Sequence, residues 1–162
     1  MNKDIQFVML VGIAGSGKST VARRLNDVFN TEFVILSSDD IREEIYGDAS
    51  VQNNPARIFK LLNQSTLDHL AAGHSVVYDA TNLKRSSREA ILKKIHDLET
   101  VTNTNITCTC VIVNADVDTC ILRQNLRNRK VPAEVIKRQA NSYEPVTSAE
   151  GWDTIFNYNR LT

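Results

Sequence analysis

The feature that most constrains this sequence is a glycine-rich segment that directly follows a run of apolar residues. Residues 12–19 read Gly-Ile-Ala-Gly-Ser-Gly-Lys-Ser and fit GxxxxGK[ST] at every specified position. The apolar run 5–11 predicts a buried strand, and residues 19–29 have apolar side chains at helical spacing. In a strand–loop–helix unit of this kind, backbone N–H groups and the helix N-terminus surround phosphate oxygens. The sequence therefore predicts a site for a nucleoside triphosphate.

Within this loop, each residue type has its own expected role. The glycines let the backbone approach the phosphates, Lys18 reaches the β- and γ-phosphates, and the Ser19 hydroxyl is placed to bind Mg²⁺. We therefore predict a nucleoside triphosphate and Mg²⁺ as cofactors. The predicted triphosphate-binding residues of the loop are Gly12, Ala14, Gly15, Ser16, Gly17, Lys18, Ser19 and Thr20.

Composition excludes several other classes of protein. A hydrophobic fraction of 42% and a charged fraction of 23% are ordinary globular values, which argues against disorder. The 19 basic and 19 acidic residues balance, which argues against a broad basic face that coats nucleic acid. The three cysteines match no zinc spacing, and no apolar run is long enough to cross a bilayer. Because the N-terminus does not look like a secretory signal, we expect a cytoplasmic chain without a membrane partner.

Strand-like and helix-like segments alternate along the chain, which is the pattern of βαβ units. Strands are expected at 5–11, 33–36, 75–78, 106–113 and 155–158. Helices are expected at 19–29, 55–73 and 87–98, after a cap at Asp116, and from Pro132. We predict one domain over residues 1–162, a three-layer α/β/α fold with a mostly parallel sheet of about five strands. Residues of about 116–143 would form a helical lid.

The second strand ends in the polar run Ser-Ser-Asp-Asp-Ile-Arg at residues 37–42. Ligands of open α/β sheets gather beyond the carboxyl ends of the strands, so these side chains belong to the predicted site. Asp39 could accept a hydrogen bond from an acceptor hydroxyl and align its oxygen with the γ-phosphorus. Arg42 could bind an anionic part of the acceptor, and Asp40 is expected to cap the helix that follows.

The third strand ends in Asp79, and an apolar run that closes on aspartate is the Walker B pattern. Asp79 could hold the Mg²⁺ shell together with Ser19, or it could orient Arg42. Asn82, three residues later, could contact phosphate or acceptor.

Arginines gather near the end of the helix that Asp116 would cap. Arg123, Arg127 and Arg129 are spaced by four and two residues. As a lid over the triphosphate they could neutralise charge that develops during transfer. The alternative is a solvated basic helix end that complements the helix dipole.

Four segments, in order, resemble the small P-loop kinases around polynucleotide 5′-hydroxyl kinase, including the bacteriophage members. They are residues 12–19, 38–42 (Ser-Asp-Asp-Ile-Arg), 79–82 (Asp-Ala-Thr-Asn), and the arginine-bearing helix that leads into 131–136. The resemblance covers nearly the whole chain. It implies an ATP-dependent kinase that phosphorylates the 5′-hydroxyl end of RNA or DNA.

The resemblance also implies individual roles. Asp39 would be the general base, and Arg42 would bind the phosphate beside the acceptor nucleoside. Asp79 would support the acceptor site. Arg127 would be the lid arginine on the donor phosphates, with Arg123 nearby; because the lid is about one residue shorter here, Arg129 could share that role. Lys18, Asp39 and Arg127 are thus the predicted catalytic residues.

Two other functions stay open at the level of sequence. Related P-loop kinases phosphorylate small molecules such as nucleotide sugars or antibiotics, and a nucleotide-dependent switch would transfer nothing. Asp39 and Arg42 count against the switch, which needs neither an acceptor base nor an anion clamp. The bacteriophage kinases also carry a phosphatase half that has no match here, and the sequence leaves open whether a phosphatase or ligase acts in the same pathway.

Overall fold

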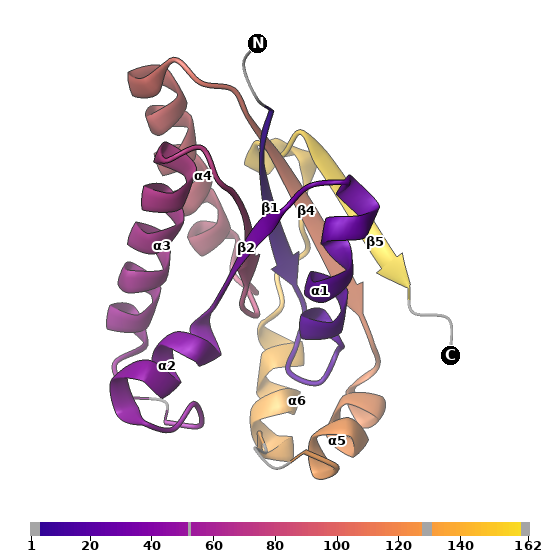
Figure 1. Ribbon diagram of the computed structural model, residues 1–162. Helices are drawn as coiled ribbons and strands as arrows, with labels where there is room; N and C mark the ends of the chain where they lie inside the picture. Colours follow the sequence, from indigo (N-terminus) through magenta and orange to yellow (C-terminus); the bar gives the residue numbers. More distant parts are fainter. Residues whose placement is uncertain (1–3, 52, 128–130, 160–162) are drawn as a thin grey trace.

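Five parallel strands form the central sheet of the computed structural model, which describes residues 4–51, 53–127 and 131–159 (Figure 1). Their order across the sheet is β2–β3–β1–β4–β5, and every neighbouring pair is parallel. The strands are β1 (Ile5–Val11), β2 (Phe33–Ser37), β3 (Ser75–Asp79), β4 (Ile106–Asn114) and β5 (Thr154–Asn159). The predicted α/β class and parallel sheet are confirmed.

Helices cover both faces of this sheet and give three layers (Figure 1). The helices are α1 (Lys18–Phe29), α2 (Ser38–Tyr46), α3 (Pro55–Ala71), α4 (Arg85–Thr102), α5 (Val117–Asn125), α6 (Ala133–Ser142) and the short 3₁₀ helix η1 (Ser148–Glu150). The helix predicted at 87–98 is thus longer at both ends. The predicted cap at Asp116 is confirmed, because its carboxylate accepts a hydrogen bond from the amide of Thr119. The helix expected from Pro132 begins one residue later, at Ala133, with Pro132 at its N-cap.

Strand β1 shows why the chain forms this sheet. Phe7 and Met9 point into the core between the sheet and helices α3 and α4, whereas Val8 and Leu10 pack against α1. All four side chains are almost fully buried. A central parallel strand is buried on both faces, which explains the continuous apolar run that precedes the glycine-rich loop.

The same topology gathers the predicted site at one edge of the sheet. In the strand register, Asp79 lies beside Leu10 of β1 and beside Ser37 of β2. The loop after β1, the start of α2 after β2 and the end of β3 therefore meet. Among the described residues, no helix combines the length and the apolar character needed to cross a membrane.

Candidate active site

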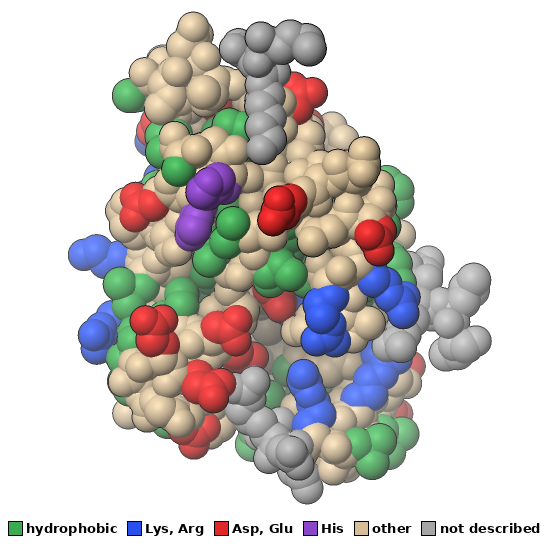
Figure 2. Space-filling view, in the orientation of Figure 1, with side chains coloured by type: hydrophobic (Ala, Val, Ile, Leu, Met, Phe, Trp, Pro, Cys, Tyr) green, Lys and Arg blue, Asp and Glu red, His purple; other side chains and the backbone are tan. Residues whose placement is uncertain are grey.

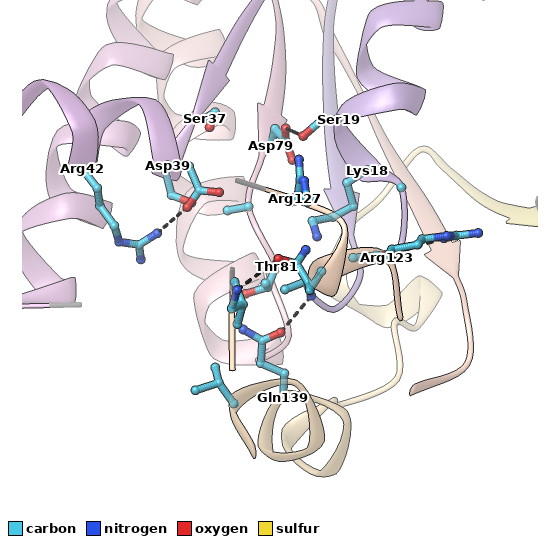
Figure 3. A pocket seen from close by; sticks show the side chains of 18 of the residues that line it. Lys18, Ser19, Ser37, Asp39, Arg42, Asp79, Thr81, Arg123, Arg127 and Gln139 are labelled. Carbon is cyan, nitrogen blue, oxygen red and sulfur yellow. Dashed lines mark hydrogen bonds and ion pairs between the residues drawn. The ribbon is translucent and has the colours of Figure 1, made fainter. Parts of the chain in front are cut away.

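A cavity of about 490 Å³ lies where the ends of β1, β2 and β3 meet the helices α5 and α6 (Figure 3). Most of the predicted site residues line it: Ala14, Gly15, Gly17, Lys18, Ser19, Thr20, Asp39, Arg42, Asp79, Arg123 and Arg127. Gly12, Ser16 and Asn82 do not. Figure 2 shows acidic side chains over α2 and basic side chains over α1 and α5, on opposite sides of the hollow.

The loop of residues 12–19 has the backbone that its glycines predict. Gly15 has a φ of +82°, and a β-carbon there would lie 2.6 Å from the carbonyl oxygen of Cys120. At Gly12, a β-carbon would lie 2.7 Å from the carbonyl oxygen of Val113. A side chain at either position would displace main chain, so close packing requires both glycines, and at Gly15 the positive φ also favours glycine.

Lys18 begins α1 and lies in the cavity, where its Nζ donates a hydrogen bond of 3.0 Å to the carbonyl oxygen of Ile13. Removal from water lowers the pKa of this ammonium, whereas the negative charges of Asp79 and Asp39 act in the opposite direction. A desolvated cation at the start of a helix attracts an anionic ligand strongly, because both the charge and the helix dipole favour it.

Ser19 and Asp79 form the second element of the site. The Ser19 hydroxyl donates a hydrogen bond of 3.1 Å to Oδ2 of Asp79. Burial raises the pKa of the Asp79 carboxyl, while the charge of Lys18 and the hydrogen bond from Ser19 act in the opposite direction. No group of three or more His, Cys, Asp or Glu side chains in the described ranges could hold a metal by itself. One hydroxyl and one carboxylate fit Mg²⁺, which keeps several waters and shares the phosphate oxygens of its nucleotide.

Asp39 and Arg42 face the cavity from the first turns of α2. Arg42 donates a hydrogen bond of 3.0 Å from one terminal nitrogen to Oδ1 of Asp39. The Asp39 side chain is 59% exposed, whereas that of Arg42 is 10% exposed. The Nε of Arg42 has no hydrogen-bond partner among the described residues. The guanidinium therefore keeps a buried donor for a further acceptor group.

The predicted helix cap at Asp40 is wrong. The cap is Ser37, whose Oγ accepts a hydrogen bond of 3.2 Å from the backbone N–H of Asp40. Because β2 runs directly into α2, the last strand residue takes the cap position and both aspartates fall in the first turn. The two carboxylates then complement the positive end of the helix dipole.

The arginines of the lid reach the loop in different ways. Arg123 donates hydrogen bonds of 3.1 and 3.2 Å to the carbonyl oxygens of Gly15 and Ser16, so it holds the outer, carbonyl side of the loop. Arg127 points toward Lys18 and Asp79 in Figure 3, and its charge adds to the desolvation that lowers the pKa of Lys18. Arg129 lies outside the described residues.

Asn82 is not brought together with the other predicted residues. Its side chain is buried and donates hydrogen bonds of 2.6 and 3.1 Å to the carbonyl oxygens of Leu10 and Ala80. Its φ of 51° shows that it forms a left-handed turn, a conformation that asparagine tolerates well. The amide thus fixes the loop after β3 to the end of β1.

Sequence reasoning missed two glutamines that line the cavity. Gln139 of α6 accepts a hydrogen bond of 2.8 Å from the backbone N–H of Ala14. Gln124 of α5 accepts one of 3.1 Å from the N–H of Val131, and its Nε2 is buried without a partner among the described residues. A glutamine within a helix carries no motif, so only the folded chain reveals these contacts.

A family model described as an AAA domain matches residues 7–146, which is most of the sequence. The chain belongs to this AAA domain family. No sequence among curated proteins matches the chain.

Solved structures resemble this AAA domain closely in fold. A fungal RNA kinase has a TM-score of 0.69 at 16% identity over 98% of this chain and 39% of its own. A chain of the Pnkp1/Rnl/Hen1 RNA repair complex has a TM-score of 0.62 at 24% identity, over 88% and 45%. The APS kinase CysC of Mycobacterium tuberculosis, solved with AMPPNP and APS, has a TM-score of 0.61 at 17% identity, over 98% and 91%. The fold is that of P-loop kinases, and this chain spans about two fifths of the RNA kinase.

Proposed function

We propose that this AAA domain is an ATP- and Mg²⁺-dependent phosphotransferase that phosphorylates the 5′-hydroxyl end of RNA or DNA. One observation carries the proposal: the Asp39–Arg42 pair and the loop lysine Lys18 line the same cavity from separate elements. A cavity that only binds and hydrolyses a triphosphate needs no second charged pair at the far side. A kinase does, because the acceptor must be bound and aligned there.

In the proposed reaction, Asp39 accepts the proton of the acceptor hydroxyl as that oxygen bonds to the γ-phosphorus. The bond from the γ-phosphorus to the β–γ bridging oxygen breaks, and ADP leaves with that oxygen. The Asp39 side chain is exposed, and Arg42 donates a hydrogen bond to its Oδ1. Within the described part of the chain its Oδ2 accepts no hydrogen bond, so this oxygen is available to the acceptor. In a loose transition state, the position of this carboxylate matters more than its basicity.

The surrounding residues stabilise the charge that moves during transfer. Lys18 and Arg127 lie on the donor side of the cavity, where negative charge accumulates on the β- and γ-phosphates. Ser19 and Asp79 would hold Mg²⁺, which neutralises phosphate charge when bound. Arg42 keeps its unpaired Nε for a phosphate next to the acceptor nucleoside.

The likeness to RNA kinases supports a polynucleotide acceptor. A different observation supports a second candidate function, the phosphorylation of a small molecule. This chain covers 91% of the APS kinase but only 39% of the fungal RNA kinase. A domain of this size could therefore phosphorylate a small hydroxyl compound without further domains. The Arg42 guanidinium would then bind an anionic group of that small acceptor.

The test offers γ-labelled ATP and Mg²⁺ with an RNA and a DNA oligonucleotide that each carry a 5′-hydroxyl. We expect the wild type to place label on the 5′ end and the Asp39→Ala variant to lose this activity. Asp40→Ala should keep it, because the neighbouring carboxylate of Asp40 does not line the cavity. ATP binding should survive in both variants. Label on neither polymer, with ATP still bound, would reject the polynucleotide and direct the search to small hydroxyl acceptors.

A further inference from the structure

Helix α6 reaches the triphosphate loop through one side chain. Oε1 of Gln139 accepts a hydrogen bond of 2.8 Å from the N–H of Ala14 (Figure 3). Ala14 is the third residue of the loop, and 125 positions separate the two residues in sequence. No other hydrogen bond of Gln139 exists within the described residues, so the two Nε2 donors remain for a neighbour.

A second lid helix holds the same loop from its other side. Arg123 of α5 donates to the carbonyl oxygens of Gly15 and Ser16, which directly follow Ala14. The two lid helices thus bind three consecutive residues of the loop, one helix through the backbone N–H of Ala14 and the other through the backbone carbonyls of Gly15 and Ser16. The conformation of this part of the loop therefore depends on the positions of helices α5 and α6.

The end of α6 nearest to Gln139 is fixed to the protein core. Arg88, which is fully buried, donates hydrogen bonds of 2.9 Å to the carbonyl oxygen of Glu144 and of 3.0 Å to that of Leu83. The N–H of Glu144 donates a further bond of 2.9 Å to the carbonyl oxygen of Leu83. Gln139 lies in the last turn of α6, five residues before Glu144, so a short stretch of chain links it to this anchor.

Gln139 also lines two neighbouring cavities. A second cavity of about 440 Å³ extends between α3, α4 and α6, and it shares Gln139, Thr81, Val135 and Phe59 with the first. Its volume lies in the range of ordinary ligand pockets. The glutamine therefore stands beside the loop that would hold the donor and also borders a second space of ligand size.

We propose that Gln139 is a positioning residue for phosphoryl transfer, which fixes the backbone N–H of Ala14 and with it the triphosphate loop that would hold the donor. The proposal rests on the proposed function. A shift of about 1 Å in the reacting groups can cost about a hundredfold in rate. Loss of the Gln139 contact should therefore lower kcat more than it weakens ATP binding, because most of the loop still binds phosphate.

The experiment compares three variants. Gln139→Met keeps the length of the side chain but removes the acceptor oxygen, and Gln139→Glu keeps an acceptor oxygen. Lys137→Met changes an exposed residue of the same helix that lines neither cavity. Hydrogen–deuterium exchange at the Ala14 amide is measured without nucleotide or acceptor, and kcat and KM for ATP are measured on each protein.

We expect Gln139→Met to speed exchange at Ala14 roughly tenfold, to lower kcat roughly 10- to 100-fold, and to change KM for ATP less than about threefold. Gln139→Glu should keep slow exchange, and Lys137→Met should match the wild type. Unchanged exchange in Gln139→Met, or faster exchange with unchanged kcat, would overturn the proposal. If the wild type phosphorylates none of the acceptors offered, the proposed acceptor fails, while exchange at Ala14 and the rate of ATP hydrolysis by water still test Gln139.

Discussion

The hydroxyl of Ser19 lies 3.1 Å from Oδ2 of Asp79, which joins the start of α1 to the end of β3. The two residues are 60 positions apart in sequence. They meet because β1 and β3 are parallel neighbours whose carboxyl ends lie side by side. A metal ion bound to both oxygens would therefore lie between the start of α1 and the end of β3.

Asp79→Asn should weaken the use of Mg²⁺. The amide keeps an oxygen for Ser19 but removes the charge, and such changes around a metal cost roughly 10- to 100-fold in affinity or activity. We expect the Mg²⁺ concentration for half-maximal ATP turnover to rise by that factor. Asp68→Asn, an exposed position on α3, serves as the control and should leave the Mg²⁺ titration unchanged.

The same substitution should stabilise the protein when no nucleotide is bound. Burial raises the folded-state pKa of Asp79, so its ionised form opposes folding at any pH above that value. This cost disappears as the pH falls to the ordinary carboxyl pKa of 3.8, where the unfolded chain also takes up the proton. Asp79→Asn should therefore raise Tm at neutral pH, by roughly 2–4 °C for each kcal/mol of added stability. At acid pH the increase in Tm should be smaller. An equal or lower Tm at neutral pH, measured by calorimetry, would contradict the assignment.

Arg42→Met should separate acceptor binding from ATP binding. The buried guanidinium offers its unpaired Nε to an anionic acceptor, and a hydrogen bond to a charged group is worth about 1.5–3 kcal/mol. We expect KM for the acceptor to rise roughly 10- to 100-fold while KM for ATP stays the same. Arg57→Met, an exposed arginine on α3, should change neither constant. A matching rise in KM for ATP would place Arg42 on the donor side.

Much of the site could be predicted because parallel strands bring their carboxyl ends to one edge. Lys18, Asp39 and Asp79 each follow an apolar strand of one parallel sheet, so their meeting follows from topology alone. The strands themselves were predictable because β1 and β3 are buried on both faces and read as apolar runs.

The remainder depends on backbone detail that the sequence does not carry. Asn82 resembled a ligand residue, but its left-handed φ turns the amide toward the carbonyl oxygen of Leu10. The helix cap is Ser37 and not Asp40 because α2 begins directly after the strand. The sequence pattern does not locate that boundary to the residue. Gln139 meets Ala14 only through the packing of the lid, over a sequence separation that no local pattern records.

The cysteines should be unreactive in the folded protein. The chain has three, all of them buried and without disulfides. Desolvation raises the pKa of the thiols of Cys108 and Cys110 to about 12, and it also raises the pKa of Cys120. Since the thiolate is the reactive form, iodoacetamide at neutral pH should modify none of them in the native protein and all three in urea. Mass spectrometry of the intact protein counts the adducts, and rapid native labelling would mean that the core opens.

Arg88→Met should strongly destabilise the fold, because it leaves a buried charge on Glu150. The Arg88 Nε and the Glu150 carboxylate are 2.8 Å apart, and both side chains are fully buried. Removing one member of such a pair typically costs about 3–5 kcal/mol, whereas replacing both with apolar residues often costs far less. Arg88→Met combined with Glu150→Met should therefore recover part of the loss in urea unfolding. Arg85→Met, which breaks the exposed pair with Glu89 on the same helix, should change the free energy of unfolding little. An equal loss of unfolding free energy in Arg85→Met and Arg88→Met would show that Arg88 does not hold the loop after β3 to the end of the lid.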